Sequence, residues 1–212
     1  MKRFTIVTLY PELLKPYTDG SILGRAQKNK HIRIGYINLR DFGLGRYKQV
    51  DDTPYGGGAG MILKADVAVP AIEQARGKRG RVILLSPAGR QFSQQVARDL
   101  SQENHIVLVC GRFEGVDERV KKYVDDEISV GPYVTAGGEL PALIIVESIA
   151  RLIPKVLGNP NSPEDESFSD NTLEYPQYTK PAEFRKQYVP DVLISGDHKK
   201  IKAWREEHQK RI

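Results

Sequence analysis

The feature that most constrains the fold is a regular alternation, along residues 4–153, of short apolar runs with amphipathic stretches. The apolar runs are rich in β-branched residues and predict strands at 4–9, 31–37, 81–86 and 105–110. The stretches with helical periodicity predict helices at 66–75, 92–102, 115–124 and 138–153. Strands that are apolar on both faces are typical of a parallel sheet covered by helices on each side. The pattern therefore predicts an α/β fold of crossover units.

Composition sets the size and the surroundings of this fold. A chain of 212 residues with 40% hydrophobic residues can bury one substantial core and carry a small appendage. Its one cysteine, Cys110, excludes an internal disulfide, and the four scattered histidines give no metal-ligand spacing, so no metal site is expected. The N-terminal run meets Pro11 and Glu12 too early for a secretion signal, and no apolar window is long enough for a membrane span. We expect a cytoplasmic protein without a membrane partner.

A change in composition marks the C-terminal part of the chain. Between Asn159 and Glu174 there are five acids and no Lys or Arg, which is typical of a linker. The expected division is a main domain (1–158), a linker (159–174) and a small helical domain (175–212). The closing stretch GDHKKIKAWREEHQKRI predicts a helix with six basic residues against three acids. The surplus of basic residues over the whole chain, 32 against 27, is mild and by itself favours a polyanionic partner only weakly.

The stretch VDDTPYGGGAGM, residues 50–61, is too rich in glycine to continue a helix or a packed strand. One interpretation of such a segment is a loop whose backbone binds a phosphate group. However, Met61 stands where a P-loop would need its lysine, so a P-loop is excluded. A plain surface loop and a nucleic-acid-binding or lid loop both stay open.

Turns rich in Gly and Pro follow three predicted strands, namely 81–86, 105–110 and a further short strand, DDEISV, at 125–130. They lie at Ser86–Gly89, Gly111–Gly115 and Gly131–Gly138. In open α/β sheets, ligands bind at the carboxyl ends of the strands, where such turns converge. Turns with little side-chain charge present backbone N–H and C=O groups, which suits a ligand such as an adenine with its ribose. Because no GxGxxG follows the first strand, a nicotinamide dinucleotide is disfavoured.

Seven motifs, in this order and spacing, resemble those of the bacterial tRNA (guanine-N1)-methyltransferase family. They are VDDTPYGGGAGM, LLSPAGRQF, LVCGRFEGVDERV, EISVGPYVTAGGELPALIIVES, RLIPKVLGN, ESFSDNTLEYPQYTKP and VLISGDHKKIKAWR. The resemblance implies a SPOUT-class methyltransferase with a deep trefoil knot, a small helical C-terminal domain and an obligate homodimer with its active site at the subunit interface. The implied reaction is S-adenosylmethionine-dependent methylation, at N1, of the guanosine immediately 3′ of the anticodon, position 37 of tRNA.

The resemblance also implies a set of residues that line the methyl-donor pocket, and these are the three turns noted above. They are Leu85, Ser86, Pro87, Gly111, Phe113, Glu114, Gly115, Ser129, Val130, Gly131, Tyr133, Thr135, Gly137, Gly138 and Pro141. Glu114 is the carboxylate expected to stabilise the sulfonium or the amino group of the donor. Pro132 and Thr135 stand where the family more often has Asp and Leu.

The implied catalytic residues are Arg151, as the cation for guanine O6, and Glu166, as the base that takes the N1 proton. The family usually has Asp at the position of Glu166, and the neighbouring Asp165 could substitute for Glu166 or raise its pKa. The alternatives without a catalytic role are that Arg151 is a cation that stabilises the C-terminus of its helix, and that the acids of the linker are simply solvated.

The family implies that the glycine-rich stretch and the basic C-terminal end contact tRNA. The implied substrate contacts are Arg25, Arg46, Asp51, Gly56, Gly57, Gly58, Lys199, Lys200 and Arg205. The family also suggests that Mg²⁺ assists the reaction, and the C-terminal domain is expected to be shorter than usual and to bind tRNA less tightly. Two other functions stay open, a knotted ribose 2′-O-methyltransferase and an RNA-binding module without catalysis.

Overall fold

A parallel five-stranded sheet forms the centre of the first of two units, Met1–Gly158. The structure is a computed structural model and describes residues 1–157 and 172–211. The strand order is β2-β1-β6-β5-β7, and every pair is parallel. The strands are β1 (Lys2–Thr8), β2 (Ile32–Asn38), β5 (Arg81–Gln91), β6 (His105–Cys110) and β7 (Asp126–Ser129). The predicted α/β class with a parallel sheet is confirmed.

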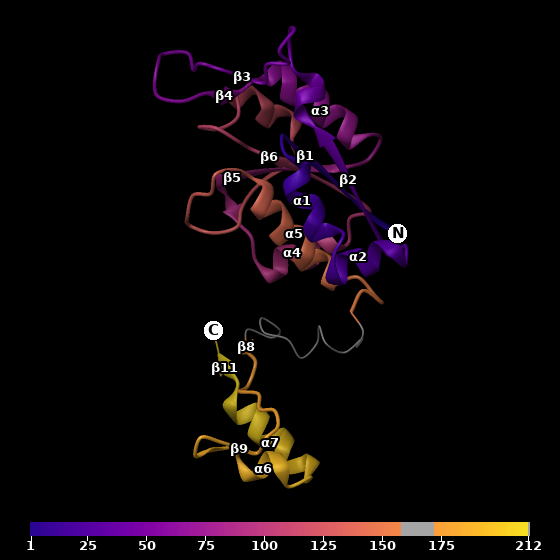
Figure 1. The fold of residues 1–212 in the computed structure, drawn as a ribbon, viewed down its shortest axis with the longest axis vertical. Helices are drawn as coiled ribbons and strands as arrows, with labels where there is room; N and C mark the ends of the chain where they lie inside the picture. Colours follow the sequence, from indigo (N-terminus) through magenta and orange to yellow (C-terminus); the bar gives the residue numbers. More distant parts are fainter. Residues whose placement is uncertain (158–171, 212) are drawn as a thin grey trace. The chain divides into compact units, whose positions relative to one another are not determined.

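Helices cover both faces of this sheet (Figure 1). One face carries α3 (Ala65–Arg76), and the other carries α1 (Pro11–Thr18), α2 (Ser21–Lys28), α4 (Gln94–Ser101) and α5 (Glu139–Arg151). Alternate residues of one strand serve the two faces: Ile83 packs in the cluster of α4 and α5, and Val82 packs in the cluster of α3. Because the residues on both faces of these strands are buried, each strand appears in the sequence as a continuous apolar run.

The helix expected at 115–124 is wrong in type. The structure has a 3₁₀ helix, η2 (Glu118–Tyr123), that begins only after the chain has paired with the short strand β4 (Ile62–Leu63). In this pairing Leu63 donates to the carbonyl of Gly115 and accepts from the N–H of Asp117. Those backbone groups are therefore not free to open an α-helix at Gly115.

The sequence analysis also missed α1 and α2, which connect β1 to β2. Pro16 lies inside α1, and Ser21 begins α2 with a positive φ of 47°. Short helices interrupted in this way give too few turns for a clear periodicity.

The first glycine-rich turn, Ser86–Gly89, lies inside β5 and not after it. Leu85 and Arg90 both pair with Ile128 of β7, so the four residues between them bulge out of the ladder. The chain then runs so close to β7 that a Cβ on Gly89 would lie 2.5 Å from the carbonyl carbon of Glu127. A glycine at this position is what permits the close approach.

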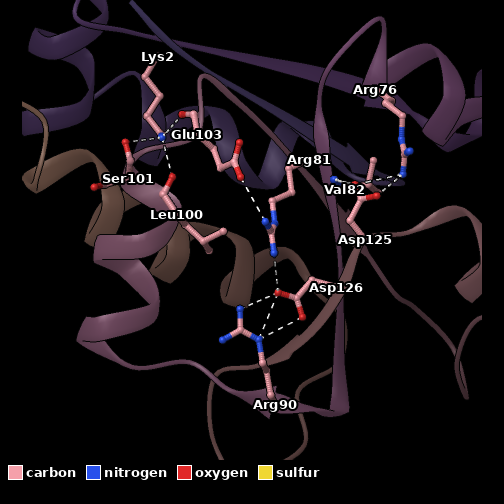
Figure 2. A network of polar contacts seen from close by, with 10 residues as sticks. All are labelled: Lys2, Arg76, Arg81, Val82, Arg90, Leu100, Ser101, Glu103, Asp125 and Asp126. Atoms are coloured by element: carbon pink, nitrogen blue, oxygen red, sulfur yellow. Dashed lines mark hydrogen bonds and ion pairs between the residues drawn. The ribbon is translucent and has the colours of Figure 1, made fainter.

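A network of polar contacts fixes β5 against β7 (Figure 2). Arg90 donates to both carboxylate oxygens of Asp126, with a shortest distance of 2.6 Å, and these hydrogen bonds hold the pKa of Asp126 below its ordinary value. Arg81 lies between Asp126 and Glu103 and pairs with each of them. The network therefore ties the start and the end of β5 to β7 and to the segment after α4.

The second unit, Asn159–Ile212, is small, and most of its residues within 172–210 are exposed. Its described elements are β8 (Thr172–Leu173), β9 (Glu183–Phe184), β10 (Gln187–Tyr188), α6 (Asp191–Ile194), α7 (His198–His208) and β11 (Lys210–Arg211). The expected basic C-terminal helix is confirmed as α7, which begins where the Asp197 carboxylate accepts from the N–H groups of Lys199 and Lys200. The division into domain, linker and C-terminal domain stays a prediction.

Candidate functional site

A cavity of about 360 Å³ opens where β6 and β7 end and where β5 bulges out of its ladder with β7. This volume falls within the range of small-molecule sites, about 300 to 1,000 Å³. The three turns singled out in the sequence form its wall, together with Pro141 in the first turn of α5. Every residue that the resemblance assigned to the methyl donor lines this cavity. The structure thus brings together segments that lie more than 50 residues apart.

The third turn, which follows β7, is held by its own side chains. The buried hydroxyl of Ser129 donates to the carbonyl of Gly131 at 3.0 Å, and Thr135 donates in the same way to Gly137 at 2.9 Å. The ring of Tyr133 folds back over Gly131, where a Cβ would come within 2.1 Å of the ring. The turn is therefore shaped before any ligand binds, and its backbone lies open along the cavity.

The second turn, which follows β6, is held from outside by the end of the glycine-rich stretch. The N–H of Glu114 donates to the carbonyl of Met61 at 3.0 Å, and a Cβ on Gly60 would lie 2.4 Å from Cγ of Glu114. Phe113 adopts a positive φ of 60°, which is uncommon for a residue with a side chain. Strain of this kind is often found where the chain is shaped for a ligand.

Several charged residues on the cavity wall were not foreseen, namely Arg112, Glu118, Lys121 and Glu127. Lys121 pairs with both Glu118 and Glu127, at 3.1 and 3.4 Å. Within the described residues, Oε1 of Glu127 is buried without a hydrogen-bond partner. Arg112 could have been noticed, because it lies inside the GRFEG turn, whereas nothing in the sequence singled out Lys121 or Glu127.

The structure places Arg151 away from the cavity of its own chain. The cavity wall includes Gly138 and Pro141 at the start of α5, and Arg151 is the last of the 13 residues of this helix. At a rise of 1.5 Å per residue, the two ends lie about 18 Å apart. Glu166 and Asp165 lie outside the described residues.

The residues expected to contact tRNA lie on the surface of both units. Arg25 is exposed on α2, and Arg46 is exposed in the segment between η1 (Leu39–Phe42) and β3 (Asp51–Asp52). Asp51 is the first residue of β3, so the stretch VDDTPYGGGAGM contains a two-residue strand that the sequence analysis did not expect. The other expected contacts on α7 are exposed, and Arg205 lies 4.9 Å from the ring of Tyr175.

Three exposed glycines of this stretch, Gly56 to Gly58, are required by backbone conformation and not by close packing. Gly56, Gly57 and Gly58 are exposed and have φ values of 85°, 81° and 131°, where side chains are strained. A Cβ on Gly56 or Gly57 would meet no atom within 4 Å. Tyr55 beside them is fully exposed. The stretch therefore presents open backbone at the surface, as a segment that lies against a partner would.

A metal site is not assembled by the part of the chain that the structure describes. Within 1–157 and 172–211, no group of three or more His, Cys, Asp or Glu side chains could hold a metal ion. In the same ranges, no helix is long and apolar enough to cross a membrane.

Comparison with known proteins agrees with this geometry. The family model for the tRNA (guanine-1)-methyltransferase TrmD matches residues 1–212. The tRNA (guanine-N(1)-)-methyltransferase of Carboxydothermus hydrogenoformans is 50% identical over 204 residues, which cover 96% of this chain and 81% of that protein. The enzymes of the same name from Thermus thermophilus and Staphylococcus carnosus are 49% and 50% identical, each over 96% of this chain and 84% of their own length. The chain therefore belongs to the tRNA (guanine-1)-methyltransferase family TrmD.

Proposed function

We propose that this protein methylates N1 of the guanosine at position 37 of tRNA and takes the methyl group from S-adenosylmethionine. The observation that carries the proposal is the cavity at the carboxyl edge of the sheet, whose wall contains every residue expected to hold the donor. The family match over the whole chain supports the methyltransferase activity and its tRNA substrate.

The cavity suits the chemistry of the donor, which supplies an electrophilic methyl group on a positively charged sulfur. The open backbone of the third turn, at Val130, Gly131 and Gly137, can recognise the edge of an adenine. Glu114 and Glu127 line the wall as carboxylates, which can accept hydrogen bonds from the hydroxyl or amino groups of the donor. The residues present thus fit the donor. We assign no residue to Mg²⁺.

The reaction needs a base and a cation next to the guanine. N1 of guanine carries a proton at neutral pH, so a base must remove it as the methyl group transfers, and negative charge then develops on O6. We assign Glu166 as the base, with Asp165 as its neighbour, and Arg151 as the cation for O6. An anticodon loop presents its bases at low unstacking cost, so the guanine can turn out to meet these groups.

A homodimer would bring these groups to the cavity. Arg151 is not among the residues that line the cavity of its own chain and lies about 15 Å along α5 from Pro141, which does line it, so we infer that a second chain supplies this cation. An apolar strip of Leu140 and Ile144 on α5, exposed by 64% and 43%, begins beside the cavity. Leu13 and Tyr17 extend it on α1, and the Tyr17 hydroxyl donates to Glu147 of α5. Such a patch favours a protein partner, and a second copy would carry its own Arg151 to the site.

We assign the tRNA contacts to the glycine-rich stretch with Arg46, to Arg25, and to the basic residues of α7. Phosphate contacts by Lys and Arg position an RNA without reading its bases. The same proposal includes the SPOUT class with its trefoil knot and a cytoplasmic location.

The test is methylation of a tRNA transcript with guanosine at position 37, followed by mapping of the modified atom by mass spectrometry. We expect 1-methylguanosine at position 37 and no product with a transcript that carries adenosine there. Methylation at a ribose oxygen would favour the 2′-O-methyltransferase alternative. Donor binding without any methylation would favour the RNA-binding module.

Glu166→Gln tests the assignment of the base. Without a group to take the N1 proton, kcat should fall about 10²- to 10⁴-fold, while donor binding measured by calorimetry stays unchanged. Asp165→Asn is the matched control, and its kcat should fall much less. An unimpaired Glu166→Gln enzyme would end the assignment.

A further inference from the structure

Next to the cavity lies a polar cluster formed by the buried residues Thr8 and Glu139 and the partly buried residues Tyr10 and Arg112. Glu139 is the first residue of α5, and only 5% of it is exposed. Its Oε1 accepts a hydrogen bond of 2.8 Å from the hydroxyl of Thr8, which is fully buried on β1. Its Oε2 lies 3.5 Å from Nε of Arg112. A buried carboxylate is costly unless it is paired, and here it has both a cation and a hydroxyl donor.

Arg112 connects Glu139 to the wall of the cavity. Its Nη1 donates to the carbonyl of Ala136 at 3.1 Å, and Ala136 belongs to the third turn. The guanidinium also lies over the ring of Tyr10, 4.6 Å from the centroid. The N–H of Tyr10 in turn donates to the Thr8 hydroxyl at 3.0 Å. A continuous polar chain therefore runs from β1, through Glu139 and Arg112, to the third turn.

The glycines of the third turn are shaped to lie against this chain. A Cβ on Gly137 would lie 2.5 Å from Oε2 of Glu139 and 2.7 Å from Nε of Arg112. Next to it, the N–H of Gly138 donates to the carbonyl of Gly111 at 2.9 Å, which joins the third turn to the second. The backbone of 136–138 therefore lies flat on the pair of Arg112 and Glu139.

We propose that Thr8, Glu139 and Arg112 form a positioning brace that holds the second and third turns together and so sets the affinity for the methyl donor. The inference rests on the proposed function, because the cavity must be the donor site. Thr8 and Glu139 do not line the cavity, so they act through Arg112 and the turn. The brace fixes the turn before the donor arrives, which lowers the ordering cost of binding.

The sharpest test is at Thr8, which is remote from the donor. Thr8→Val keeps the shape of the side chain but removes the hydrogen bond to Glu139, and Thr8→Ser restores the hydroxyl. We expect Thr8→Val to weaken binding of S-adenosylhomocysteine, measured by calorimetry, by about tenfold, and Thr8→Ser to bind within a few-fold of wild type. Arg112→Lys, which loses the fork that reaches Ala136, should weaken binding by about 10- to 100-fold.

Kinetics separate positioning from general damage. KM for the donor should rise in Thr8→Val and Arg112→Lys, while kcat at saturating donor and KM for tRNA stay near the wild-type values. Arg119→Lys is the matched control, since it alters an Arg–carboxylate pair with Asp117 that is exposed at the surface. It should leave every constant unchanged.

Two outcomes would overturn the brace, and they differ from failure of the proposed function. If wild type binds the probe and both Thr8→Val and Arg112→Lys bind it equally well, the brace has no effect on the donor. If the variants lose kcat and tRNA affinity in parallel with donor affinity, the cluster only supports the fold. If wild type itself does not bind the probe, the proposed donor site is wrong and the brace falls with it.

Discussion

At the scale of single residues, the site depends on glycines that allow two backbones to touch. Gly138 has an ordinary φ of −78°, so the backbone conformation at this position does not require a glycine. A Cβ there would lie 2.6 Å from Cα of Cys110, closer than side chains tolerate against backbone. The turn that lines the cavity would have to move away from β6 to accept it.

Gly138→Ala should therefore weaken donor binding by at least tenfold and lower the free energy of unfolding by about 1 to 3 kcal/mol through overpacking. Calorimetry with S-adenosylhomocysteine and denaturant unfolding measure the two effects. Gly35→Ala is the matched control, because a Cβ at Gly35 in β2 meets no atom within 4 Å. Equal donor affinity in the two variants would contradict the importance of the close approach.

At the scale of elements, the edge of the sheet at β5 and β7 carries the first and third turns. Both Leu85 and Arg90 pair with Ile128, so β5 is paired with β7 before and after the bulge that lines the cavity. The ion pairs of Arg90 and Arg81 with Asp126 strengthen this strand pairing at the edge of the sheet (Figure 2). We infer that the network keeps the first turn in register with the third.

Arg90→Met tests the network through its pH dependence. The pKa of Asp126 is lowered in the folded state, so its pairing stabilises the fold above the ordinary pKa of 3.8 and is lost as the pH falls through the lowered value. The variant should lose about 1 kcal/mol of unfolding free energy at pH 7, and the difference from wild type should shrink below about pH 3.8. In a double-mutant cycle, Asp126→Asn should remove most of the effect of Arg90→Met. A deficit that stays constant with pH would show that the ion pair is not its source.

The strands of the main sheet, the helices α3, α4 and α5 and the three turns could be predicted from the sequence because each depends on local pattern. Runs such as 81–86 and 105–110 are apolar throughout, and glycines mark where the chain must turn. The brace could not be predicted, since Thr8 and Glu139 are 131 residues apart and only the fold brings them together. The type of η2 was also missed, because it depends on pairing with β4, a strand of two residues with no periodicity to detect.

At the scale of the whole molecule, the account requires two chains for one reaction centre. The cavity that we assign to the donor lies at the start of α5, and Arg151 lies at the end of this helix. The exposed apolar strip that begins beside the cavity offers a surface for a second copy. We therefore infer that each centre combines the cavity of one chain with Arg151 and Glu166 of the other.

A mixed dimer tests this claim most directly. One chain would carry Gly138→Val, which blocks its cavity, and the other would carry both Arg151→Ala and Glu166→Gln. Each homodimer should be inactive. In the purified mixed dimer, the intact cavity of the second chain meets the intact Arg151 and Glu166 of the first, so we predict methylation of guanosine 37 at about half of the wild-type rate. A mixed dimer that forms and binds donor but is as inactive as the two homodimers would contradict the account.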